Sequence, residues 1–127
     1  MKAYVVDTHA LVWYLAGDRR LGPRAEAVLN DPDVTLIIPA IVLAEIKDLV
    51  HKGRFAQTLS DVLAVIGSDV RCRVHPIDLD VVTATPTQLD IHDSLIVGVA
   101  LVQSMPVDGV LTCDQAIVRA NLVPTVW

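Results

Sequence analysis

The chain has 127 residues, of which 53% are hydrophobic and 20% charged, and its formal net charge is −5. This length predicts a single domain, residues 1–127, that can bury a core without disulfide bonds. The acidic balance argues against binding nucleic acid through a broad basic surface, and no apolar run approaches the roughly 20 residues that a membrane-spanning helix needs.

In chain order, short apolar runs alternate with helical patterns. The runs at residues 3–7, 35–38, 70–75, 110–113 and 123–127 predict strands, because β-branched and apolar residues dominate them. Apolar residues at helical spacing predict helices at residues 8–16, 24–30, 41–51, 55–66, 78–84, 93–103 and 114–120. Strands separated by helices favour parallel pairing through right-handed crossovers. The expected fold class is therefore α/β, a three-layer α/β/α sandwich around a central, mainly parallel sheet.

Four carboxylates lie where a folded α/β protein would least favour an isolated charge. They end or interrupt apolar runs at the junctions of predicted elements, and they are Asp7, Glu45, Asp93 and Asp114. An ionised carboxylate is costly to remove from water unless it is paired or bound to a metal. Ligands of such folds bind at the carboxyl ends of the strands, where all four acids can converge. A shared divalent cation is one explanation of the whole set.

Each acid also has a structural interpretation. Asp7, Asp93 and Asp114 each precede or open a predicted helix, where an aspartate side chain caps backbone N–H groups. Capping does not explain Glu45, which lies within or beside the apolar stripe of its helix, although a glutamate at the stripe edge can reach solvent. Thr112 precedes Asp114 by two residues, so their side chains point to the same side of an extended segment.

The chemistry of these side chains narrows the class of site. An all-oxygen set favours Mg²⁺ or Mn²⁺ over Zn²⁺. The sequence lacks a glycine-rich dinucleotide motif, a P-loop, a Cys-His metal spacing and a serine nucleophile elbow. His9 and His92 are expected to be structural or supporting residues, and Asp90 is either an auxiliary ligand or a loop acid. The N-terminus has no signal-peptide pattern, and a cytoplasmic protein with reduced cysteines at Cys72 and Cys113 is expected.

Four short motifs follow one another in a recognisable order. They are VDTHALVW at residues 6–13, PAIVLAEI at 39–46, IHDSLI at 91–96 and LTCD at 111–114. This order resembles the PIN domain, specifically a VapC-type toxin ribonuclease of a type II toxin–antitoxin system. The resemblance extends over the whole chain. One departure is Ser94, where similar sequences often carry an arginine that contributes to substrate positioning.

The resemblance implies a function. Asp7, Glu45, Asp93 and Asp114 would bind Mg²⁺ or Mn²⁺ with support from Thr112, and a metal-activated water would hydrolyse RNA phosphodiester bonds. It also implies a toxin that is held by a VapB-like antitoxin and forms a homodimer. Basic residues near Lys47, Lys52 and Arg54 would receive the RNA.

Two alternatives remain open at this stage. One is a binding module with a PIN-like fold and no catalytic activity. The other is a phosphatase-type hydrolase with Asp7 as the nucleophile, although such enzymes usually carry a second aspartate two residues later, where this chain has His9. Which RNA is cut, whether one or two ions bind, and the class of the antitoxin are not determined by the sequence.

Overall fold

The computed structural model describes residues 1–127 and contains five strands and seven helices. The strands are β1 (Ala3–Val6), β2 (Thr35–Pro39), β3 (Cys72–His75), β4 (Gly109–Leu111) and β5 (Thr125–Val126). The helices are α1 (Thr8–Ala16), α2 (Pro23–Asn30), α3 (Ala40–His51), α4 (Leu59–Ser68), α5 (Leu79–Ala84), α6 (Ile91–Leu101) and α7 (Gln115–Ala120).

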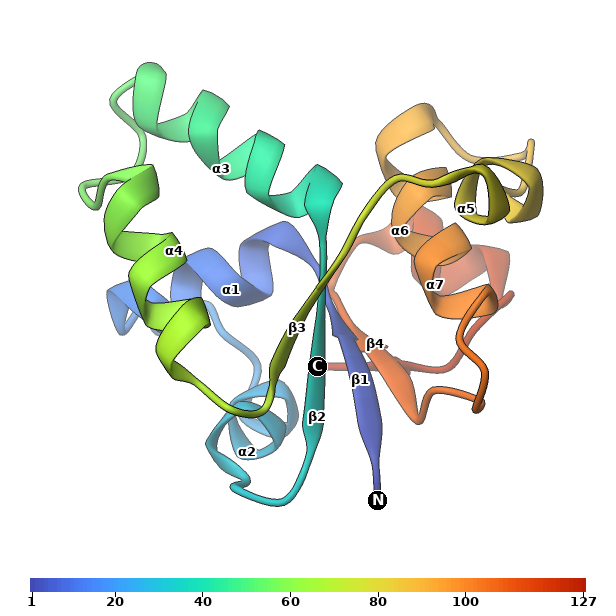
Figure 1. Cartoon of the computed structure of the whole chain (residues 1–127), viewed down its shortest axis with the longest axis horizontal. Coiled ribbons are helices and arrows are strands. Elements are labelled where there is room, and N and C mark those ends of the chain that lie inside the picture. The colour runs from blue at the N-terminus through green and yellow to red at the C-terminus, as the bar shows by residue number, and fades with distance from the viewer.

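The five strands form one sheet in the order β3-β2-β1-β4-β5, and every pair is parallel. Helices α1 to α4 lie on one side of the sheet and helices α5 to α7 on the other, which gives three layers (Figure 1). The predicted α/β/α sandwich is confirmed, and the sheet is entirely parallel. Strand β1 lies at the centre of the sheet. From β1 the chain adds β2 and β3 on one side and then crosses back to add β4 and β5 on the other, so the strand order changes direction beside β1. Ligand sites of open α/β sheets lie at such switch points.

One hydrophobic cluster of 28 buried residues fills the space between the layers. Strands β1 and β4 are buried on both faces, as expected for a parallel sheet covered by helices, and Val5, Val6, Val110 and Leu111 have no exposed surface. Each fully buried side chain of this kind contributes about 1.5–3 kcal/mol relative to an exposed one. This core fixes the edge of the sheet from which the acidic residues project.

Several helices begin where an acid or a threonine caps the backbone. The side chains of Asp7, Asp78, Asp90 and Asp114 accept hydrogen bonds from the first turns of α1, α5, α6 and α7. Helix α4 begins after a capping box, in which Thr58 and Asp61 each accept a hydrogen bond from the other's backbone N–H.

Two predicted helix starts are wrong. The helix expected from residue 55 begins at Leu59, because the capping box at Thr58 outweighs the apolar spacing that pointed to Phe55. Phe55 is buried, but in the loop before α4. The helix expected from Asp93 begins at Ile91 with Asp90 as its cap, so Asp93 lies in the first turn.

None of the helices is both long enough and apolar enough to cross a membrane. Both cysteines are free thiols, and each is partly buried.

Candidate metal centre

Parallel pairing brings the end of β1 beside the end of β4. Val6 pairs with Leu111, and the backbone N–H of Asp7 donates to the Leu111 carbonyl at 3.1 Å. The next residue of that segment, Thr112, is buried, and its hydroxyl donates to Asp7 Oδ2 at 2.5 Å. Two residues 105 positions apart in sequence therefore share one hydrogen bond at the centre of this edge.

Asp7 is both a helix cap and a buried acid. Its Oδ1 accepts from the Thr8 backbone N–H at 2.6 Å, and its side chain belongs to a residue that is only 8% exposed. Burial raises the pKa of this carboxyl, and the hydrogen bonds from Thr112 and Thr8 offset part of the rise. Asp7 therefore caps α1 as predicted, but this role does not explain why the carboxyl group is buried.

Asp114 lies close to Asp7 through Thr112. The Thr112 hydroxyl oxygen accepts from the Asp114 backbone N–H at 3.0 Å, which fixes the turn after β4. Asp114 Oδ1 caps α7 by accepting from Ala116 N at 2.8 Å and from Ile117 N at 3.4 Å. Its Oδ2 makes no hydrogen bond within the chain. One oxygen of this carboxylate therefore has a structural partner, and the other is free to bind a ligand.

Asp93 does not cap its helix. Asp90 has that role, with its Oδ1 accepting from Asp93 N at 3.3 Å, and the Asp93 side chain forms no hydrogen bond. Partial burial raises the pKa of Asp93 to about 6, with further contributions from the negative charges of Asp114, Asp90, Asp7 and Glu45. Asp93 thus lies within electrostatic range of all the other candidate ligands. The four acids are thus neighbours in space, and their role as metal ligands stays a prediction.

Glu45 reaches the same place from α3. Its side chain is 25% exposed, and burial is the main reason that its pKa is raised, with Asp7 adding to the rise. The His92 ring lies beside it, with its Nδ1 4.0 Å from Glu45 Oε1. Glu45, His92, His9 and Thr8 line a hollow of about 280 Å³. The Thr8 hydroxyl there is buried without a hydrogen-bond partner of ordinary geometry.

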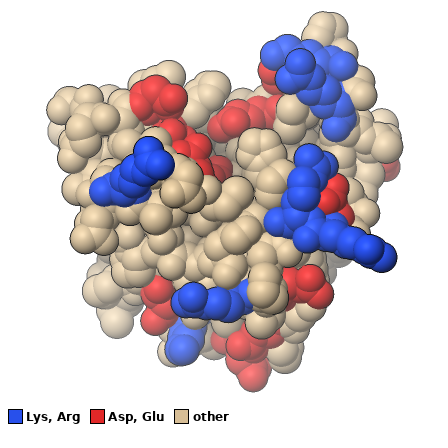
Figure 2. All heavy atoms as spheres, turned by 180° about the vertical axis from the view of Figure 1, so that it is seen from behind, with Lys and Arg blue, Asp and Glu red and all other residues tan.

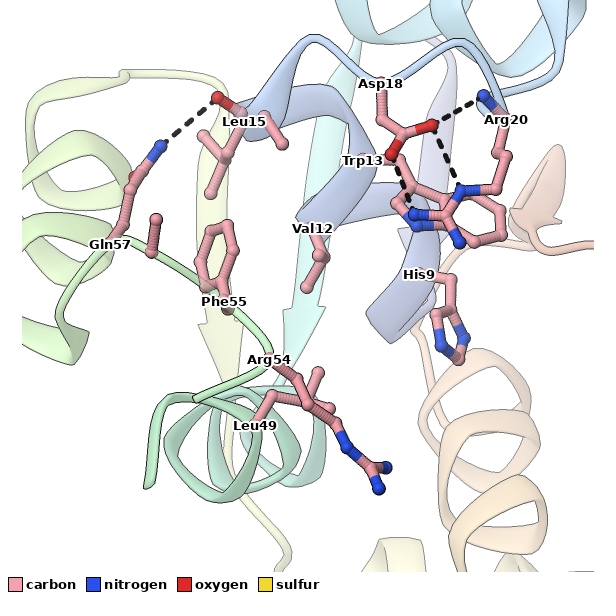
Figure 3. A pocket seen from close by; sticks show the side chains of 12 residues that line it. His9, Val12, Trp13, Leu15, Asp18, Arg20, Leu49, Arg54, Phe55 and Gln57 are labelled. Atoms are coloured by element: carbon pink, nitrogen blue, oxygen red, sulfur yellow. Dashed lines mark hydrogen bonds and ion pairs between the residues drawn. The ribbon is translucent and has the colours of Figure 1, made fainter. Parts of the chain in front are cut away.

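A second, larger hollow of about 590 Å³ adjoins the first. His9 and Leu49 line both hollows, so the two adjoin at these residues, and together they are called the groove. Figure 3 shows its walls, with Trp13 behind the paired side chains of Asp18 and Arg20. Sequence reasoning did not identify this groove, because its walls come from α1, α3 and the loop before α4.

The comparisons with known proteins agree with this architecture. The family model described as the PIN domain matches residues 4–121. This chain belongs to the PIN domain family. No curated protein matches the sequence.

Two solved PIN-like structures share the fold of this PIN domain at low sequence identity. VapBC2 from Rickettsia felis, solved with a DNA fragment from the promoter of the pair, is 18% identical, with a TM-score of 0.67 over 97% of this chain and 96% of that chain. VapC20 from Mycobacterium tuberculosis, described as a toxin that cleaves the sarcin-ricin loop, is also 18% identical, with a TM-score of 0.65 over 93% of this chain and 95% of that chain.

The acidic edge of this PIN domain suits a divalent cation in its donor chemistry. No lysine or arginine forms an ion pair with Asp7, Glu45, Asp93 or Asp114, although three arginine or lysine ion pairs form elsewhere. Figure 2 shows acidic side chains gathered around a hollow, with basic side chains at separate points beside it. No three His, Cys, Asp or Glu side chains lie close enough together to hold a metal ion as they stand.

Ser94 has a structural role in this PIN domain. It is buried, and its hydroxyl lies 2.8 Å from the Pro86 carbonyl oxygen and 3.0 Å from the Leu89 carbonyl oxygen. The loop between α5 and α6 is thereby fixed to α6.

Proposed function

We propose that this PIN domain is a Mg²⁺- or Mn²⁺-dependent endoribonuclease that acts as the toxin of a toxin–antitoxin pair. One observation carries the proposal. Carboxylates that follow β1, lie on α3 and α6 and follow β4 are near one another at one sheet edge, and none has a lysine or arginine partner. Burial raises the pKa of Asp7, Glu45 and Asp93, and neighbouring carboxylates add to the rise. A cluster of this kind favours a divalent cation that restores charge balance.

Four residues would hold the metal. Asp7 and Glu45 would approach it from one side of the edge, and Asp93 and Asp114 from the other. When bound, the ion would lower the pKa of a water molecule and stabilise the negative charge that develops on the phosphate in the transition state. Thr112 orients two of these acids, because its hydroxyl donates to Asp7 and accepts from the backbone of Asp114.

The RNA would approach across the adjoining groove. Of the basic residues expected to receive it, Lys52 is engaged in an ion pair of 2.7 Å with Asp48. Lys47 and Arg54 are exposed and form no ion pair, so they are the cations available to phosphate. Cleavage that leaves a 5′-phosphate and a 3′-hydroxyl is expected from the family resemblance.

A VapB-like antitoxin and a second copy of the chain are the proposed protein partners, in the cytoplasm. Apolar side chains on α5 and at the start of α6 are well exposed, including Leu79, Val82 and Ile91. These are compatible with a homodimer contact through helical faces. A basic side chain from the antitoxin would supply the counter-charge that the acidic edge lacks, and it would compete with the metal there.

The phosphatase-type alternative is disfavoured by the environment of Asp7. A nucleophilic carboxylate needs an oxygen free to attack, whereas both Asp7 oxygens accept hydrogen bonds, from Thr8 N and the Thr112 hydroxyl. The alternative of an inactive binding module predicts a different result. It would bind no Mg²⁺ or Mn²⁺ in calorimetry, whereas the proposed enzyme binds one of these ions.

The direct test is cleavage of a structured RNA by purified protein, with Mg²⁺, with Mn²⁺ and with EDTA. We expect metal-dependent cleavage by the wild type and by Asp33→Asn, which changes an exposed loop acid whose side chain makes no contact. Asp93→Asn should lose activity. No cleavage by the wild type with either metal, or equal cleavage by Asp93→Asn, would reject the proposal.

A further inference from the structure

An aromatic stack stands beside the acidic edge. The His9 ring lies 5.1 Å from the Trp13 ring, centroid to centroid, and Trp13 contacts Trp127 edge-on at 5.7 Å. The Arg20 guanidinium covers Trp13 at 4.8 Å and is held there by Asp18, with which it forms an ion pair of 2.8 Å. Trp13 is thus fixed from several directions, and His9 is the exposed end of the stack.

His9 occupies the junction of the two hollows. It follows the candidate metal ligand Asp7 by two residues, and it lines both the smaller hollow beside Glu45 and the larger hollow. Its side chain makes no hydrogen bond to the protein, so packing on Trp13 holds the ring in place. A nucleotide that extends from one hollow into the other would therefore lie against the His9 ring.

The charges of the groove suit a nucleotide. Arg20 is neutralised by Asp18, but Arg54 is exposed and has no carboxylate within 4 Å. Figure 3 shows Arg54 and His9 at the same end of the larger hollow, and the apolar side chains of Val12 and Leu49 line its wall beside them. A flat ring, apolar walls and an unpaired guanidinium are the three elements that proteins use to hold one unstacked base and its phosphate.

We propose that His9, supported by Trp13, stacks on the nucleobase next to the scissile phosphate, while Arg54 contacts the backbone of that nucleotide. This inference rests on the proposed nuclease function and assigns two residues of its substrate site. A base inside a duplex cannot stack on His9, because its faces are already stacked on its neighbours.

The first test removes the base. Once a cleavage site has been mapped, substrates are made with an abasic ribose at each position that flanks it. We expect one abasic position to lower the wild-type kcat/KM roughly tenfold, as loss of one base–aromatic stack does. His9→Ala should lower kcat/KM roughly tenfold on intact RNA and lose nothing more on the abasic substrate, whereas His9→Phe keeps most of the effect. The proposal is overturned if the abasic substrate lowers kcat/KM of His9→Ala by a further tenfold, or if His9→Ala cleaves intact RNA as well as the wild type does.

Matched variants separate the stack from general charge. His51→Ala changes an exposed histidine that lines neither hollow, and it should cleave both substrates like the wild type. Arg54→Gln should weaken binding of the intact and abasic substrates equally, because its contact is with the backbone. Arg24→Gln, which removes an exposed charge on α2, should have no effect.

A second test does not depend on cleavage. The only two tryptophans of the chain, Trp13 and Trp127, both belong to the stack, so intrinsic fluorescence reports directly on it. With Ca²⁺ in place of Mg²⁺, an intact oligonucleotide should change the emission and its abasic counterpart should not. The same signal should be absent in His9→Ala. If no RNA is cut under any condition, the nuclease function fails while this measurement still tests the stack. Equal responses to both oligonucleotides, or a response only to a protein segment, overturn the proposed base site.

Discussion

Replacing Asp93 by asparagine should stabilise the metal-free protein while it removes the response to metal. The Asp93 carboxylate makes no hydrogen bond, and its pKa is raised from 3.8 to about 6, first by partial burial and then by the charges of four neighbouring acids. The difference of about two pKa units corresponds to about 3 kcal/mol for a fully shielded group. Because Asp93 is partly open to solvent, screening reduces this to about 1 kcal/mol. Asparagine has a similar shape and carries no charge, so this destabilising term disappears.

The pH dependence gives the sign of the effect. An acid whose folded pKa exceeds its unfolded pKa binds more protons in the folded state, so its contribution to stability falls as pH rises between the two values. The metal-free wild type should therefore lose about 1 kcal/mol from this group between about pH 4 and pH 6. Asp93→Asn should be more stable than the wild type at pH 7 and no more stable at pH 4.

Urea and thermal denaturation in EDTA measure both effects. At pH 7 we expect the melting temperature of Asp93→Asn to exceed that of the wild type by about 4 °C. Adding Mn²⁺ at about 100 times its dissociation constant should stabilise the wild type by about 2.7 kcal/mol and the variant far less. Asp33→Asn, at an exposed loop position, serves as the control and should match the wild type throughout. A variant less stable than the wild type in EDTA at pH 7, or equally stabilised by Mn²⁺, would show that Asp93 is not part of a repulsive metal-binding cluster.

Other substitutions test the surrounding structure. Thr112→Val leaves a buried oxygen of Asp7 without its donor and should lower the free energy of unfolding by about 1–3 kcal/mol in urea denaturation, whereas Thr112→Ser should lose much less. If Thr112→Val unfolded like the wild type, this hydroxyl would have no part in fixing the edge. Gly22→Ala places a methyl group 2.4 Å from the backbone of Trp127, so we expect a lower melting temperature and altered tryptophan emission. Gly67→Ala, a helical position with open space, should instead gain about 0.5–1 kcal/mol, and equal effects at the two glycines would contradict the packing of the C-terminal segment.

Much of the fold is accessible from local pattern. Strands and helices alternate along the chain, and this alternation correctly predicts a parallel sheet between two helical layers. The errors arise where two local signals compete. Apolar spacing placed Phe55 in a helix, whereas the capping box formed by Thr58 and Asp61 starts that helix at Leu59. Likewise, Asp90 rather than Asp93 caps α6, so that helix begins at Ile91.

The four acids could be identified from the sequence because each one ends or interrupts an apolar run. Their shared location depends on tertiary structure, since Asp7 and Thr112 meet only through the pairing of β1 with β4. The proximity of Glu45 to Asp7 and Asp93 depends on the contact between α3 and α6. Their roles as metal ligands remain a prediction.

The sequence by itself determined the class of fold, the types of side chain available for chemistry and the family to which they belong, because periodicity, caps and motif order are local properties. Only the tertiary structure decided the strand order, the partners of Ser94 and the stack of His9 on Trp13 and Trp127. The strand order and the contact of Trp13 with Trp127 join segments that are far apart in the chain, and the Ser94 and His9 contacts depend on how a loop and a helix pack locally. Their energies depend on distances between side chains, and folding alone sets those distances.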